Sequence, residues 1–409
     1  MKNRGLVFLF IAGVLSGCAT GRSMPERSLW RGAVELPEGI TVPFRMSLDF
    51  SGINPAGYFL VGDEQTPVPE ISRRRNSITL GFSEYSAEVQ ATWNGSQLVG
   101  SYLRIRPDGT KSFRFTAVPE TDSSNESDAT ATNATLPSGN YQVVFEDKET
   151  DDTTVAKFWD KEGAVFGTFI APDGDYGLLV GRPSGARLQL SRFTGWQAIA
   201  IVLEPEGEKW SGKFHAAHNA APRAFVLQPR AGLEVDLPAT KHTTMKDPDS
   251  AFTFSGLSLS GDTVRHTDDR FKGKALIVDI MGTWCHNCLD EAPVLQRLQE
   301  QYGKDGLEIV GLSFELTDDS SLARKNLQLY KDRFGLTFTL LFCGSTDDEN
   351  VKRQLESQLN NFFAYPTAIF IDKKGKVQAI HSGFKGPGTG DEFKAQIREF
   401  HDLTSKLVR

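Results

Sequence analysis

The sequence predicts an α/β domain at the C-terminal end of the chain, preceded by two all-β domains of sandwich or barrel type. Residues 29–119 and 139–232 alternate apolar and polar residues between Gly, Asn and Pro turns, a pattern typical of antiparallel strands. Residues 233–409 alternate extended and helical segments instead, which is typical of a sheet with helices on both faces. The chain has 409 residues, more than one ordinary core holds, so several domains are expected.

Composition is that of a globular protein with a formal net charge of −7. No basic stripe interrupts the modest acidic excess, so nucleic acid is not an expected partner. Beyond the extreme N-terminus, no stretch is apolar enough to cross a membrane.

The N-terminus has the features of an export signal. Lys2 and Arg4 precede an apolar run at 6–15, and small residues then lead to Cys18. Leu-Ser-Gly-Cys resembles the bacterial lipobox, in which the cysteine is acylated and holds the protein at a lipid bilayer. Ala19 after the cysteine favours the outer membrane over the inner one. The alternative is a plain signal peptide with an incidental cysteine.

The domains are then expected in a fixed order. Residues 1–18 form the lipoprotein signal and lipobox, and 19–28 a short tether. Between the β-rich blocks 29–119 and 139–232, residues 120–138 have hardly any core-forming side chain and predict a disordered linker. The two blocks resemble a weak internal repeat, although similar turns also arise by chance. Nothing in their sequence indicates what they bind.

Within residues 233–409, apolar runs predict strands and mixed segments predict helices. The expected strands are 252–254, 275–280, 307–314, 337–342, 368–371 and 377–380, and the expected helices are 289–302, 320–334, 349–360 and 391–407.

Two cysteines separated by two residues, Cys285 and Cys288, follow the expected strand 275–280 and open the next helix. A helix N-terminus favours the thiolate, so this arrangement is suited to exchanging a disulfide. With Cys18 acylated, only Cys343 remains, inside an apolar strand where a small core residue is expected. One CxxC in an exported protein indicates redox work, not a disulfide scaffold. A zinc site would need two more ligands at matching spacing, and none is evident, so neither metal nor cofactor is expected.

Further motifs surround the cysteines. Trp284 directly precedes Cys285, Pro293 lies five residues after Cys288, and Tyr365-Pro366-Thr367 leads into an apolar strand. With these motifs, residues 233–409 resemble a thioredoxin-fold domain of the TlpA/ResA type, a group of extracytoplasmic reductases. The resemblance covers somewhat under half of the chain.

The resemblance implies roles for individual residues. Cys285 would be the attacking nucleophile and Cys288 the resolving cysteine. Pro366 would be a cis-proline, and the backbone of the preceding residue would pair with a substrate strand. The residues expected to contact substrate are Trp284, His286, Asn287, Tyr365 and Pro366.

Two acids match proton acceptors of the superfamily. Asp279, six residues before Cys285, matches the buried acid of thioredoxin, and Glu291 matches the acid near the ResA-type site. Burial would raise the pKa of either and allow it to act as a general base. The alternative for Glu291 is a solvated charge that complements the helix dipole.

The dipeptide His286-Asn287 departs from the common Gly-Pro or Glu-Pro. A charged histidine beside the nucleophile would stabilise the thiolate and favour an oxidant, within potentials of ~−270 to ~−120 mV for such proteins. The direction of electron flow therefore stays open at this point.

The sequence thus predicts an envelope-anchored thiol–disulfide oxidoreductase, acting as a reductase on disulfide-bearing envelope proteins. Its electron donor would be an unidentified membrane or envelope thiol. One alternative is an oxidase or isomerase with the same site. The other is a ligand-binding lipoprotein whose thioredoxin domain is only a scaffold.

Overall fold

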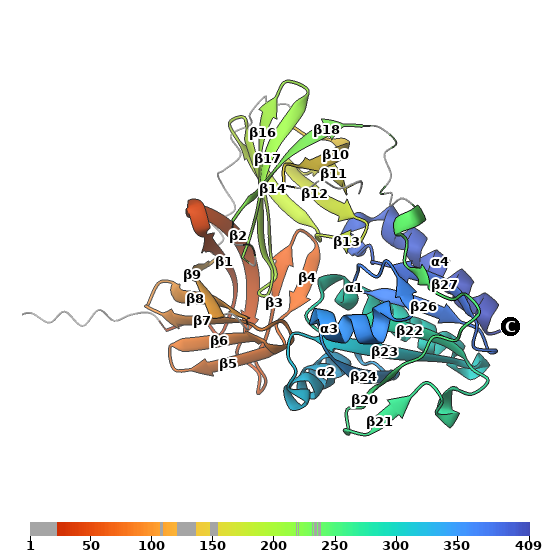
Figure 1. Cartoon of the computed structure of the whole chain (residues 1–409). Helices are drawn as coiled ribbons and strands as arrows, with labels where there is room; N and C mark the ends of the chain where they lie inside the picture. The colour runs from red at the N-terminus through yellow and green to blue at the C-terminus, as the bar shows by residue number, and fades with distance from the viewer. Residues whose placement is uncertain are drawn as a thin grey trace, which may run out of the picture.

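The computed structural model describes residues 23–106, 109–120, 136–147, 154–217, 221–230 and 239–409, together with Asn219, Gly232 and Val235. Residues 27–119 build one antiparallel sheet and residues 139–229 a second one. The residues that follow build a mixed sheet with helices (Figure 1). The expected signal, Cys18 and residues 121–135 of the expected linker lie outside the described residues. Among the described residues, no helix is long and apolar enough to cross a membrane.

The first sheet has nine strands in the order β4-β3-β2-β1-β9-β8-β7-β6-β5. Alternating side chains along its strands are buried, as the alternating sequence pattern predicted. β1 begins at Arg27, two residues before the expected block, and the side chain of Met24 is already buried. The strands are β1 (Arg27–Leu36), β2 (Ile40–Asp49), β3 (Ala56–Val61), β4 (Glu64–Pro67), β5 (Glu70–Arg74), β6 (Ser77–Phe82), β7 (Ala87–Trp93), β8 (Leu98–Arg106) and β9 (Gly109–Pro119).

The second sheet closes on itself. Its order is β11-β10-β18-β17-β16-β15-β14-β12-β13, and β11 also pairs with β12, so eight strands form a ring. Aromatic and aliphatic side chains such as Phe158, Phe169 and Phe225 fill the interior of this barrel. The strands are β10 (Gly139–Phe145), β11 (Thr154–Lys161), β12 (Ala164–Ala171), β13 (Gly174–Asp175), β14 (Leu179–Ser184), β15 (Arg187–Phe193), β16 (Ala198–Glu206), β17 (Lys209–Ala216) and β18 (Arg223–Pro229).

The two β sheets share one topology. The run β3-β2-β1-β9-β8-β7-β6-β5 of the first sheet corresponds strand for strand to β12-β11-β10-β18-β17-β16-β15-β14 of the second. They differ in closure, because β12 pairs with β14 as well as with β11, whereas β3 pairs with β4 and not with β5. The common strand order supports the internal repeat that the sequence suggested.

The C-terminal sheet has the order β21-β20-β24-β23-β22-β26-β27. Strands β22, β23 and β24 are parallel to one another, and β26 is antiparallel to both of its neighbours, β22 and β27. Its strands are β20 (Ser255–Leu257), β21 (Thr263–Arg265), β22 (Ala275–Met281), β23 (Leu307–Glu315), β24 (Thr339–Ser345), β26 (Thr367–Ile371) and β27 (Val377–Ser382). Its helices are α1 (His286–Tyr302), α2 (Ser320–Phe334), α3 (Asp348–Val351) and α4 (Asp391–Leu407).

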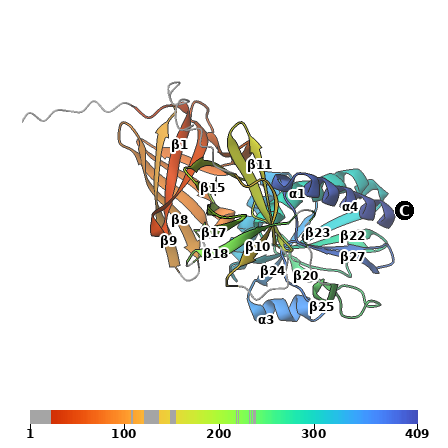
Figure 2. The same ribbon diagram turned by 90° about the horizontal axis from the view of Figure 1, so that it is seen from above.

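Helices cover both faces of this sheet, as predicted. α1 and α4 lie on one side and α3 on the other (Figure 2). β22 is buried along its whole length, with Ile277 facing the α1 side and Val278 the α3 side. One expected helix was wrong in extent: α3 ends at Val351, a π-helical turn (Lys352–Glu356) follows, and Leu359–Asn360 form strand β25 against β19 (Thr244–Met245).

Candidate active site

The CxxC lies where β22 gives way to α1. Cys285 is the N-cap of α1, and its Sγ accepts a hydrogen bond from the backbone N–H of Cys288 at 3.3 Å. The two cysteines form a disulfide, with Cα atoms 5.3 Å apart. Cys285 is 6% exposed and Cys288 is fully buried, so the first sulfur is the more accessible one. The helix N-terminus favours a thiolate at Cys285 when the pair is reduced.

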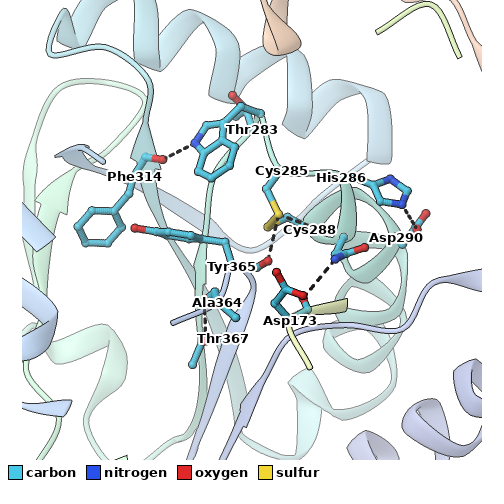
Figure 3. Close-up of a disulfide and its surroundings, with 12 residues drawn as sticks. Asp173, Thr283, Cys285, His286, Cys288, Asp290, Phe314, Ala364, Tyr365 and Thr367 are labelled. Atoms are coloured by element: carbon cyan, nitrogen blue, oxygen red, sulfur yellow. Dashed lines mark hydrogen bonds and ion pairs between the residues drawn. A yellow bond between two sulfur atoms is a disulfide. The ribbon is translucent and has the colours of Figure 1, made fainter. Parts of the chain in front are cut away.

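A cis peptide bond joins Tyr365 to Pro366, which confirms the predicted cis-proline. The carbonyl oxygen of Tyr365 lies 3.3 Å from the Sγ of Cys285 (Figure 3). Trp284 lies beside this tyrosine, with ring centroids 5.4 Å apart, and its Nε1 donates to the carbonyl of Phe314. The structure therefore brings Trp284, Tyr365 and Pro366 together around the nucleophile.

The loop before the cysteines is held by a buried acid that the sequence analysis missed. Glu315, at the end of β23, accepts hydrogen bonds from the backbone N–H and the hydroxyl of Thr283 and from the hydroxyl of Ser313. Burial raises the pKa of Glu315. Gly282 allows the loop to approach closely, because a Cβ there would lie 2.8 Å from the carbonyl oxygen of Phe314. The signal in the sequence that could have identified Glu315 is its position as an acid at the end of an apolar strand.

The two acids chosen from the sequence lie in the core. Asp279 is 4% exposed and Glu291 is 1% exposed, so a solvated role for Glu291 was wrong. Burial raises the pKa of Asp279 to about 7. Burial also raises the pKa of Glu291 well above its usual value, and the neighbouring Asp279 carboxylate raises it further. These two carboxyl groups are therefore suited to hold one proton between them near neutral pH.

A second residue missed from the sequence is Tyr330 of α2. Its hydroxyl donates to the carbonyl oxygen of Cys288 at 2.8 Å, and its side chain is buried. It therefore ties α2 to the first turn of α1. Its position in the middle of a helix gave no sign of this contact.

The intervening dipeptide faces the β sheets. Asn287 donates through Nδ2 to the carbonyl of Asp173, and the His286 ring lies 5.5 Å from the ring of Trp196. Burial, with the nearby Arg192 guanidinium, lowers the pKa of His286 to about 3. His286 is therefore uncharged at neutral pH and does not stabilise the thiolate through a positive charge, contrary to the sequence-based suggestion.

Among the described residues, one group has the atoms of a metal site: Asp175, His286 and Asp290, with ligand atoms within 4.8 Å of one another. Asp175 already accepts from the backbone N–H groups of Gly177 and Gly386. Burial and the neighbouring Asp175 raise the pKa of Asp290 well above its usual value, and the positive charge of Arg192 nearby opposes a cation here. We interpret the group as a polar contact between β13 and α1.

Cys343 is free and buried in β24. Burial raises the pKa of its thiol to about 12, so it stays protonated and poorly nucleophilic. This agrees with the predicted role as a small core residue.

Comparison with known proteins places this site in a family. The profile of the AhpC/TSA family matches residues 248–380. The thioredoxin-like protein YneN of Bacillus subtilis (strain 168) is 30% identical over 143 residues, which cover 35% of this chain and 75% of YneN. The thiol-disulfide oxidoreductase ResA of Geobacillus thermodenitrificans is 31% identical over 147 residues, covering 35% of this chain and 74% of ResA. The chain belongs to the TlpA/ResA-like proteins of the thioredoxin superfamily.

The match of the AhpC/TSA profile, at residues 248–380, lies within the C-terminal sheet and its first three helices. Among solved structures, a thiol:disulfide interchange protein of Chlorobium tepidum TLS aligns with 40% of this chain and 98% of its own, at 21% identity and a TM-score of 0.30. The two β sheets lie before the residues that the family profile matches.

Proposed function

We propose that the protein is an envelope-anchored thiol–disulfide oxidoreductase that reduces disulfides in protein partners. The observation that carries the proposal is the Cys285–Cys288 pair at the start of α1, beside the cis Tyr365–Pro366 bond. The TlpA/ResA-like relationship supports the reaction class, since YneN is named thioredoxin-like and ResA a thiol-disulfide oxidoreductase.

The reaction balances two electrons and two thiols. The Cys285 thiolate attacks one sulfur of the client disulfide, and the other client sulfur leaves as a thiolate. Cys288 then attacks the Sγ of Cys285, which releases the second client thiolate and forms the protein's own disulfide. The client is reduced, and the Cys285–Cys288 dithiol is oxidised.

The buried acids supply the proton acceptor for the second step. Cys288 is fully buried, so its thiol must lose a proton inside the protein before it attacks. Glu291 lies one helical turn after Cys288, and Asp279 shares its proton. A carboxyl pair with pKa values raised toward neutrality is suited to accept this proton.

The neutral His286 supports the reducing direction. A cationic histidine would stabilise the thiolate and make the couple more oxidising, and here burial removes that charge. An oxidase or isomerase with the same atoms is the competing proposal. A reduction potential near ~−150 mV would argue against reduction.

Anchoring and location remain part of the proposal. Acylated Cys18 would hold the protein at a bilayer, with the outer membrane slightly favoured, and an envelope thiol would re-reduce the disulfide. A function as a ligand-binding lipoprotein has less support, because apolar side chains fill the barrel interior.

The full-length protein tests the reaction. Turnover of a short peptide disulfide with a thiol donor should be abolished in Cys285→Ser. Cys288→Ala should instead accumulate a mixed disulfide through Cys285, and its stable adducts would identify clients. Equal, negligible turnover by the native protein and Cys285→Ser would contradict the proposal.

A further inference from the structure

The β sheets lie directly against the residues around the nucleophile. Before Cys285, the hydroxyl oxygen of Thr283, which donates its proton to Glu315, lies 3.4 Å from the carbonyl oxygen of Glu84. After it, the Nδ2 of Asn287 donates to the carbonyl of Asp173 at 3.2 Å. Glu84 lies in the 3-10 turn between β6 and β7 of the first sheet, and Asp173 lies in the turn between β12 and β13 of the second, so turns of both sheets reach the CxxC loop.

An aromatic stack completes this contact. Trp196, between β15 and β16, lies against His286, and its other neighbour is Tyr85, with ring centroids 4.2 Å apart and nearly parallel planes. Figure 3 shows His286 and Asp173 on the side of the disulfide away from Phe314. We call the residues that contact this side the β cover: Glu84, Tyr85, Asp173 and Trp196.

Charged groups hold the β cover in place. Arg333 of α2 forms an ion pair with Glu84 at 2.7 Å, and both side chains are largely buried. Asp175, next to the turn that carries Asp173, accepts from the backbone N–H of Gly386. Removing one partner of a buried ion pair is costly, because the other charge remains without compensation. The contacts of Glu84 and Asp175 therefore hold the β cover against the C-terminal domain.

On the opposite side of the disulfide lie aromatic residues of the C-terminal domain. Trp284 and Tyr365 are partly exposed, and Phe362 packs against Tyr365 with centroids 5.3 Å apart. Phe363, the next residue in the chain, is 40% exposed. The accessible approach to Cys285 is thus an apolar edge beside the main chain of Tyr365.

From this one-sided access, and resting on the proposed function, we propose that the β cover selects the client by its shape. An extended or unfolded segment carrying a cysteine reaches Cys285 along the Trp284–Tyr365 edge. A disulfide on the surface of a folded protein brings a wide surface with it, which collides with the β cover. Such a client reacts only with molecules in which the cover has moved away.

The test compares one disulfide in two settings. Reduced full-length protein is mixed with a small folded protein that has one exposed disulfide, or with the linear peptide that carries the same disulfide. Each rate is divided by the rate of dithiothreitol with the same substrate, which removes intrinsic differences in reactivity. Because the folded client waits for a minor open state, the peptide should react at least about tenfold faster on this scale.

Loosening the cover should remove the preference. Arg333→Gln, which breaks the ion pair with Glu84, and Trp196→Ala, which removes the stacked ring, should each raise the rate with the folded client and leave the peptide rate unchanged. Arg45→Gln is the matched control, because its ion pair with Glu120 lies within the first β sheet. Circular dichroism would show that each variant is folded.

Equal normalised rates for peptide and folded client in the native protein would overturn the inference. The inference would also be overturned if Arg333→Gln and Trp196→Ala both kept the native preference for the peptide over the folded client. If neither substrate reacts, the proposed function itself fails, which is a different result.

Discussion

At the residue scale, the site depends on the different surroundings of its two sulfurs. Cys285 caps α1 and receives a backbone N–H, whereas Cys288 is enclosed and lies near two acids with raised pKa values. The first position favours a thiolate, and the second keeps a thiol until a base accepts its proton.

Alkylation of the reduced protein should separate the two cysteines. The rate at which Cys285 reacts with iodoacetamide should rise with pH around a midpoint well below the free-thiol pKa of about 8.5. Cys288 should react slowly because it is buried. Mass spectrometry of the modified peptides measures both rates against pH. Cys343 is the internal control and should stay unmodified. A Cys285 that titrates like free cysteine would contradict this.

The buried acids should make stability fall as pH rises. The folded pKa of Asp279, about 7, lies above its unfolded value of about 3.9, so the unfolded state releases this proton first. Between pH 4 and 7 the free energy of unfolding should therefore decrease, by roughly 2–4 kcal/mol at 1.36 kcal/mol per pKa unit. Asp279→Asn should remove the Asp279 part of this decrease in urea titrations of the oxidised protein, whereas Glu291 and Glu315, whose pKa values burial also raises, keep the rest.

Asp372 is the matched control for this titration. Backbone N–H groups of Lys374 and Lys376 lower its pKa, so its contribution is present at neutral pH and lost as pH falls. Asp372→Asn should therefore leave the decrease between pH 4 and 7 in place. A native protein equally stable at both pH values would contradict burial of ionisable Asp279.

At the element scale, the loop between β22 and α1 is positioned from β23. Glu315 accepts three hydrogen bonds from Thr283 and Ser313, and so joins the end of one strand to the residues before Cys285. Strand positions and helix starts followed from the apolar pattern and the CxxC. The link from Glu315 to Thr283 could not be predicted in this way, because the apolar pattern does not say which residues of neighbouring strands lie opposite each other.

Truncating Glu315 should therefore loosen the loop. Glu315→Ala leaves buried donors of Thr283 and Ser313 without partners, at a cost of about 1–3 kcal/mol for each such group. Truncation also removes the unfavourable burial of the Glu315 carboxyl, so we expect a net loss of about 2–4 kcal/mol in the free energy of unfolding, less than the sum over the three donors, and a slower exchange with peptide disulfides. Glu315→Gln keeps an acceptor and should lose less than half as much. Equal losses would show that the acceptor is unimportant.

At the scale of the whole molecule, sequence reasoning recovered the classes of the parts and not their contacts. The CxxC could be predicted from its local signature, and the cis-proline and the two acids could be predicted from the family resemblance that the surrounding motifs carry. The contact of Trp196 with His286 could not, because it joins residues 90 positions apart through side chains that look like ordinary core and loop residues. The β cover is thus a product of tertiary packing.

The same packing predicts how the molecule unfolds. Core residues of the first β sheet, such as Trp30 and Phe82, form one continuous apolar cluster with α1 and α2, whereas the barrel interior is a cluster of its own. Elements that share a core tend to lose protection together. In hydrogen exchange under rising urea, strands β6 and β7 should open with α1 and α2, and strands β10 and β18 should open in a separate step. If β6 and β7 open with the barrel instead, the two β sheets unfold as one unit, separately from α1 and α2. The ion pair of Glu84 with Arg333 would then be a weak contact between two independent units.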